Sequence, residues 1–106
     1  MTHLKIDQRS LALHRLVVEK IRKNPALFDN VKRTLTHWRS IVSVNSQPYL
    51  EEWEQLVNKG IDTCLTAAVE DSEHADALRQ TSPFCGILTN QERFVFFKEW
   101  RQKNES

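Results

Sequence analysis

The scarcity of helix-breaking residues constrains this sequence more than any other feature. Its 106 residues include only two glycines and three prolines. Between these breaks, apolar residues recur every three or four positions, which is the spacing of amphipathic helices. The sequence therefore predicts an all-α fold, a single compact domain over residues 1–106 of five or six helices with short connections. We expect residues 1–6 and 103–106 to be frayed.

Capping signals predict where the helices begin and end. Asn24 suits a helix cap and Pro25 a first helical position, while Gly60 can end a helix in the left-handed conformation. Thr89 and Glu92 have the form of a capping box and predict the start of the last helix. The other expected features are a first helix over 8–23 capped by Asp7, a third from Pro48, a fourth over 62–70, and a short fifth capped by Asp71 or Ser72.

The apolar faces of these helices predict the hydrophobic core. The residues that we expect there are Leu16, Val17, Val31, Leu35, Trp38, Leu50, Trp53, Leu65, Leu78 and Phe94. Phe96 and Trp100 supply more aromatic surface than a domain of this size needs, so we also expect the last helix to support a homodimer.

Composition predicts a cytoplasmic protein without a membrane segment. Hydrophobic residues make up 40% and charged residues 27% of the chain, as in ordinary globular proteins. No apolar run reaches the roughly 18 residues that span a bilayer, and residues 1–7 lack an apolar signal-peptide core. Cys64 and Cys85 fit reduced thiols, although a single bridge between them is the alternative.

The sequence offers little catalytic or metal-binding chemistry. It contains no C-x-x-C, H-x-x-x-H or E-x-x-H pair, and its two glycines, Gly60 and Gly86, lie too far apart for a phosphate loop. Cys85 has no local signature that positions a histidine beside it, and packing beside Phe84 and Ile87 is its favoured role. We therefore expect no enzyme activity, no cofactor and no metal site.

The segment over 78–93 concentrates the rare residues and is the favoured surface for a partner protein. Arginine and aromatic side chains on a stiff turn suit interface anchors. The alternative is that Phe84, Ile87 and Leu88 close the core while Arg79 and Arg93 tie down helix ends. The candidate partner-binding residues are Arg79, Gln80, Ser82, Pro83, Phe84 and Arg93.

The charge distribution leaves nucleic-acid binding open as a second function. Residues 1–44 carry nine basic and three acidic side chains, whereas residues 45–106 carry six basic and eleven acidic ones. A basic stripe would attract phosphates, but a glycine-containing helix-turn-helix turn is missing and a solvated basic face is the simpler interpretation. The candidate nucleic-acid-binding residues are Arg15, Arg22, Lys23, Lys32, Arg33 and Arg39.

Several sequence blocks carry a resemblance to a known family. They are L-H-R (13–15), N-P-A-L (24–27), W-R (38–39), Y-L-E-E-W-E-Q-L (49–56), D-S-E-H-A-D-A-L-R-Q-T-S-P-F (71–84), G-I-L-T (86–89) and E-R (92–93). With these blocks the chain resembles a small, uncharacterised, all-helical bacterial family associated with toxin–antitoxin-like gene pairs. The resemblance implies a regulatory or antitoxin-like protein that binds another protein, such as the product of an adjacent gene, and it assigns no residue a role. The family pattern often has a small residue where this chain has Cys85 and a proline where it has Asn90.

Overall fold

The computed structural model describes residues 2–41 and 44–104, and the side chains from residue 7 onward. The described residues are helical and contain no strand, so the all-α prediction is confirmed. The elements are α1 (Thr2–Lys23), η1 (Pro25–Leu27), α2 (Phe28–Ile41), η2 (Val44–Ser46), α3 (Gln47–Lys59), α4 (Ile61–Ala68), α5 (Glu73–Arg79) and α6 (Asn90–Asn104), where η marks a single 3₁₀ turn.

Most capping predictions are confirmed. The Ser72 hydroxyl accepts a hydrogen bond from the Ala75 amide at 3.1 Å, and Gly60 has a φ of +126° between α3 and α4. In the capping box, the Thr89 amide donates to the Glu92 carboxylate at 2.8 Å and the Glu92 amide donates to the Thr89 hydroxyl at 3.1 Å. These local hydrogen bonds satisfy amides that a helix start leaves without partners.

The first two helix starts differ from prediction. α1 begins at Thr2, so Asp7 lies inside the helix and does not cap it. Asn24 makes no side-chain cap hydrogen bond, and Pro25 begins a 3₁₀ turn that precedes α2. The described residues at both ends of the chain, 2–6 and 103–104, are helical in backbone. Residues 1, 105 and 106, also expected to be frayed, lie outside the described part of the chain.

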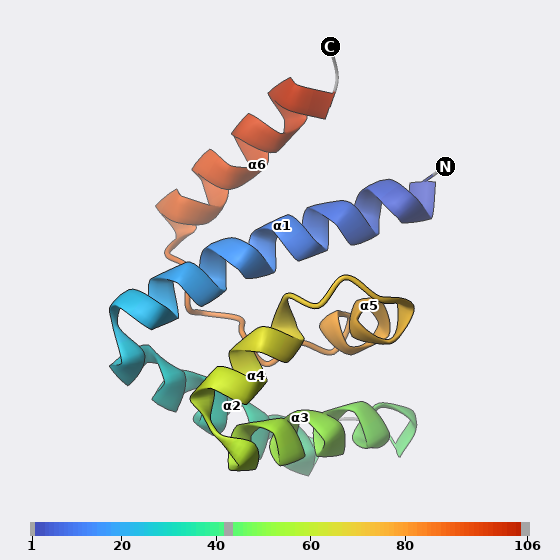
Figure 1. The fold of residues 1–106 in the computed structure, drawn as a ribbon, viewed down its shortest axis with the longest axis vertical. Coiled ribbons are helices and arrows are strands. Elements are labelled where there is room, and N and C mark those ends of the chain that lie inside the picture. The colour runs from blue at the N-terminus through green and yellow to red at the C-terminus, as the bar shows by residue number, and fades with distance from the viewer. Residues whose placement is uncertain (1, 42–43, 105–106) are drawn as a thin grey trace.

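The core lies between α1 and the layer formed by α2, α3, α4 and α5 (Figure 1). Trp53 of α3 is fully buried at its centre, and its indole nitrogen donates a hydrogen bond to the Leu78 carbonyl at 3.0 Å. Of the predicted core residues, Leu16 and Trp38 pack at the edge of the core. The fully or almost fully buried ones are Val17, Val31, Leu35, Leu50, Trp53, Leu65 and Leu78.

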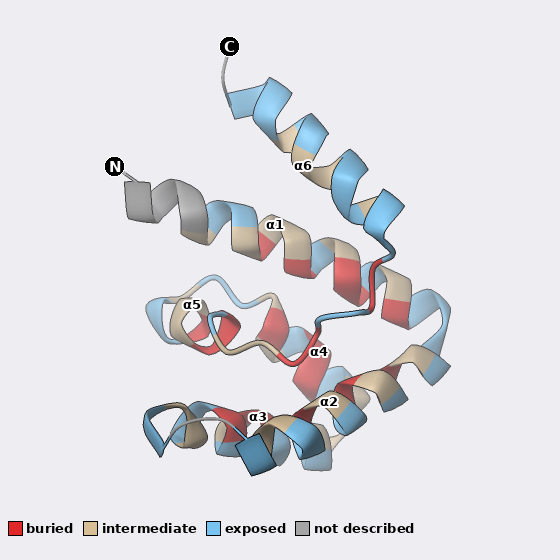
Figure 2. Cartoon of the chain, turned by 180° about the vertical axis from the view of Figure 1, so that it is seen from behind, coloured by how far each residue is buried: buried red, intermediate tan, exposed pale blue. Residues whose placement is uncertain are grey.

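Helix α6 is the exception to this packing. It lies on the far side of α1 from the core and diverges from α1 toward its own C-terminal end (Figure 1). None of its residues is buried, and Figure 2 shows the buried positions of α1 on the side away from α6. The prediction that Phe94 belongs to the core is therefore wrong, since its side chain is 63% exposed on the outer face of α6.

Candidate functional site

The connection between α5 and α6, residues 80–89, closes the core. Pro83, Phe84, Ile87 and Leu88 are buried beneath it. The Phe84 ring packs edge-on against Trp53, with ring centroids 5.4 Å apart and an interplanar angle of 78°. Such an aromatic pair adds stability beyond the apolar area that it buries. The alternative interpretation, in which these apolar side chains fold under the loop, is therefore confirmed.

The burial of this loop corrects the predicted partner surface. Phe84 is only 4% exposed, and Pro83 is fully buried. Neither side chain is accessible to another protein in this conformation. The physical reason is that apolar side chains gain stability by leaving water, even in a segment that is not helical. Phe84 does so by packing onto Trp53.

Arg79 is also buried, with 4% exposure, and it ties helix ends together. Its guanidinium donates to the carbonyl oxygens of Ala68 at 3.2 Å and Glu70 at 2.8 Å, and it forms an ion pair with Asp76. The carbonyls at the end of α4 have no partner within their helix, so an arginine that binds them acts as a C-terminal cap. Arg79 therefore joins α5 to the end of α4 and is not an exposed anchor.

Ser82 links the loop to α1 through His14. The Ser82 Oγ lies 2.7 Å from His14 Nε2, and His14 Nδ1 lies 2.7 Å from the Ser10 carbonyl oxygen. Because a carbonyl only accepts, Nδ1 carries the proton and Nε2 accepts from the Ser82 hydroxyl. Burial lowers the pKa of His14, as does the nearby Arg79 charge, while the Ser10 carbonyl opposes this shift.

A serine hydroxyl that donates to a histidine is also the arrangement of a base-activated nucleophile. Here the adjoining cavity has a volume of only about 160 Å³, below the roughly 300–1,000 Å³ of small-molecule sites. The Ser82 oxygen also accepts a hydrogen bond from the Phe84 amide at 3.3 Å. We therefore assign this pair a structural role, that of holding the loop against α1.

Two predicted partner-binding residues, Gln80 and Arg93, remain exposed. The guanidinium of Arg93 lies over the Phe97 ring, 5.6 Å from its centroid, and Arg9 of α1 lies 5.4 Å from the same centroid. Gln80 lines a hollow that also includes Arg9 and Phe97. These residues therefore mark the place where α6 is attached to α1.

The predicted nucleic-acid-binding residues do not form a uniformly free basic stripe. Arg22 pairs with Asp62, Lys23 with Glu19, and Arg39 with Glu54. Lys32 lies over the Phe28 ring, and Arg33 donates a hydrogen bond to Asn30. Arg15 borders the space between α1 and α6. Half of the candidate cations are thus paired with acidic side chains, and nucleic-acid binding stays a prediction.

The cysteines have different environments. Cys64 is buried in α4, and burial raises its pKa to about 12. Cys85 is exposed, which contradicts the expectation that it packs beside Phe84 and Ile87. Both thiols are free, so the alternative of a bridge between them is excluded in this structure. Residues 2–41 and 44–104 contain no cluster of three or more side chains suited to a metal ion.

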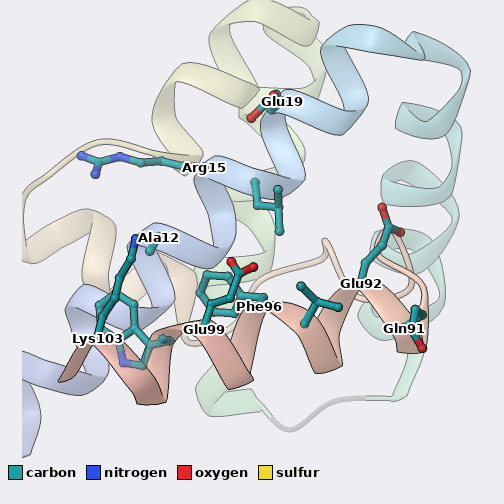
Figure 3. Close-up of a pocket in the computed structure, with 11 residues that line it drawn as sticks. Ala12, Arg15, Glu19, Gln91, Glu92, Phe96, Glu99 and Lys103 are labelled. Carbon is teal, nitrogen blue, oxygen red and sulfur yellow. The ribbon is translucent and has the colours of Figure 1, made fainter. Parts of the chain in front are cut away.

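A groove lies between α1 and α6, and the sequence indicated only part of its lining. Its volume is about 610 Å³. Phe96 and Glu99 project from α6 toward α1 (Figure 3). The excess of aromatic residues in the last helix indicated one wall, but no signal indicated the other. The groove is lined by Ala12, Arg15, Leu16 and Glu19 of α1 and by Gln91, Glu92, Val95, Phe96, Glu99, Trp100 and Lys103 of α6.

Two sets of contacts attach α6 to α1, one near the start of α6 and one near its middle. Lys20 of α1 donates to the Glu92 carboxylate at 2.5 Å and to the Ile87 carbonyl at 2.8 Å. This contact and the amide of Thr89 lower the pKa of Glu92. Farther along, Phe97 contacts Arg9. Within the groove, Phe96 stacks on Trp100, with centroids 6.2 Å apart, and neither ring is buried.

The fold and the groove define an all-α domain with one helix outside its core. No protein-family model matches the chain, and the comparisons with curated proteins and with solved structures gave no match either. The resemblance to a bacterial family therefore stays a prediction. Among the described residues, no helix has the length and apolar character needed to cross a membrane.

Proposed function

We propose that this chain is a non-catalytic protein-interaction module that binds an amphipathic helix of a protein partner in the groove between α1 and α6. The observation that carries the proposal is the state of α6. This helix has 15 residues, and none of them is buried. Helices of this length gain most of their stability from packing an apolar face, so a helix without a buried face is poised to pack against another molecule.

The chemistry of the groove supports a helical partner. Val95, Phe96 and Trp100 form an apolar stripe along α6, and Leu16 lies opposite on α1. Charged side chains border this stripe, as in grooves that accept amphipathic helices. The proposal keeps the partner-binding function expected from the sequence but moves its surface from the 79–93 loop to the groove. A regulatory or antitoxin-like role is part of the same proposal.

A site-specific photo-crosslinker tests this function. p-Benzoylphenylalanine is placed at Val95, which faces the groove and is 40% exposed. The control carries it at Val44, which is 84% exposed in η2 and does not line the groove. Irradiation of cells that express each full-length chain should give an adduct with one defined polypeptide from position 95 only.

A second variant shows whether the adduct depends on the groove. Trp100→Asp places a charge on the apolar stripe and should abolish the adduct, because burying an unpaired carboxylate is costly. Trp100 is not buried, so the variant should keep its circular dichroism spectrum and melting temperature. Equal adducts at positions 95 and 44, or no polypeptide adduct at position 95, would overturn the proposal.

A further inference from the structure

The charges around the groove have a definite order. Helix α6 runs back along α1, because Glu92 near its start binds Lys20 and Phe97 farther along contacts Arg9. At the end of the groove near Lys20, Glu92 pairs with Lys20 and Glu19 pairs with Lys23. Lys103 lies at the opposite end. Any helix that occupies this groove should complement the charged side chains that have no ion-pair partner along it.

Reversal of α6 reproduces this requirement. Six of its groove-lining residues are symmetric about the midpoint between Phe97 and Lys98. An antiparallel copy of α6 in this register would place Glu92 opposite Lys103, Val95 opposite Trp100, and Phe96 opposite Glu99. Val95 and Trp100 would meet on the apolar stripe, and Lys103 would lie beside the ion pair of Glu92 with Lys20. A parallel copy would instead place Glu92 beside Glu92 and Lys103 beside Lys103, which is repulsive.

Helix α1 supplies a further complementary charge. Arg15 lies between Lys20 and Arg9 on α1 and borders the groove at about the level of Phe96. In the antiparallel register, this is where Glu99 of the second copy would lie. Neither Arg15 nor Glu99 has an ion-pair partner within the described part of the chain. Lys103 likewise has no ion-pair partner among the described residues.

From this complementarity we infer that the occupant of the groove is α6 of a second copy of the chain, in an antiparallel and two-fold symmetric homodimer. The inference rests on the proposed function, that the groove binds a helix. A two-fold axis makes each contact occur twice. Arg15 of each copy then pairs with Glu99 of the other, and Val95 of each copy packs against Trp100 of the other.

Charge-reversal variants test the dimer, because rescue by mixing two variants requires contact between two copies of the chain. In Arg15→Glu, both symmetric contacts place two carboxylates together, and in Glu99→Arg both place two guanidinium groups together. We expect each variant alone to weaken the dimer by at least about tenfold in Kd. A mixture of the two variants should form a heterodimer of wild-type affinity, because both of its contacts join opposite charges. The double variant should also dimerise.

Sedimentation equilibrium of the purified full-length chain over micromolar to millimolar concentration measures these affinities. Arg15 and Glu99 are exposed, so unchanged melting temperatures of the monomeric forms are the check on folding. Arg33→Glu is the control, since it reverses an exposed arginine outside the groove and should leave the dimer unchanged. A wild-type chain that stays monomeric throughout, or single variants that mixing does not rescue, would overturn the inference.

The photo-crosslinker separates this inference from the proposed function. A mixture of isotopically light and heavy chains, each with p-benzoylphenylalanine at Val95, should give adducts that join light to heavy peptides from α6. A position-95 adduct with a different protein, together with a monomeric chain, would overturn the homodimer and leave the proposed function standing. The absence of any polypeptide adduct would overturn both.

Discussion

The indole nitrogen of Trp53 donates a hydrogen bond to the carbonyl oxygen of Leu78 across 3.0 Å, in the fully buried centre of the domain. This bond joins the middle of α3 to the last turn of α5. Leu78 is followed directly by Arg79 and then by the buried loop. The position of the loop, and through it the start of α6, thus depends on a contact between two residues that are 25 positions apart in sequence.

Trp53→Phe should destabilise the domain by about 1–3 kcal/mol, because the buried Leu78 carbonyl loses its indole donor and keeps only backbone donors such as the Thr81 amide. Denaturant unfolding monitored by circular dichroism measures the loss. Trp38→Phe is the matched control, since Trp38 is half-buried at the edge of the core. Equal losses in the two variants would argue against a special role for the Trp53 hydrogen bond.

Arg79→Ala and Phe84→Ala should each lower the free energy of unfolding by about 3–5 kcal/mol. The first leaves the Asp76 carboxylate and the carbonyls of Ala68 and Glu70 without their partner, and the second opens a cavity beside Trp53. Arg93→Ala, on the exposed side of α6, should stay within about 0.5 kcal/mol of wild type. Near-native stability of the first two variants would contradict the structural role of the loop.

The stability of the domain should fall as the pH drops from about 7 to about 5. Burial lowers the pKa of His14 in the fold, so the unfolded chain, with a histidine pKa of about 6.5, takes up a proton first. The contribution of the neutral His14 to the unfolding free energy is complete above about pH 6.5 and is lost as the pH falls below that value. His14→Gln should therefore flatten the pH dependence of the unfolding free energy in this range.

The exposed His37 provides the control for this pH dependence. His37→Gln should keep the wild-type slope of unfolding free energy against pH. If His14→Gln also keeps that slope, the buried histidine is not its source. The slope is the informative quantity, because the loss of the hydrogen bond to Ser82 shifts the stability of His14→Gln at every pH.

The two thiols should differ sharply in reactivity. Cys85 is exposed, whereas Cys64 is buried and has its pKa raised to about 12. Because the thiolate is the reactive form, Ellman's reagent at about pH 8 should modify only Cys85 in the native protein and both thiols in denaturant. Mass spectrometry of the labelled peptides identifies the site. Rapid native modification of Cys64 would show that α4 opens readily.

Local signals in the sequence determined the helices and most of the core. The capping box of Thr89 and Glu92 and the hydroxyl of Ser72 satisfy backbone amides within a few residues, and Gly60 takes a positive φ at a helix end. These roles are local, so they can be predicted without knowledge of the fold. The apolar stripe of α2, with Val31 and Leu35, likewise faces the core as its helical spacing predicts.

The surroundings of α6 and of the 79–93 segment were decided only by the tertiary structure. Aromatic residues occur around α6 at Phe94, Phe96, Phe97 and Trp100, so its spacing does not single out one buried face. Periodicity predicts which side chains share a face of a helix, but not which surface that face meets. An arginine or phenylalanine in a turn can likewise be exposed or buried. Arg79 and Phe84 are buried because distant residues, the carbonyl of Ala68 and the ring of Trp53, supply their partners.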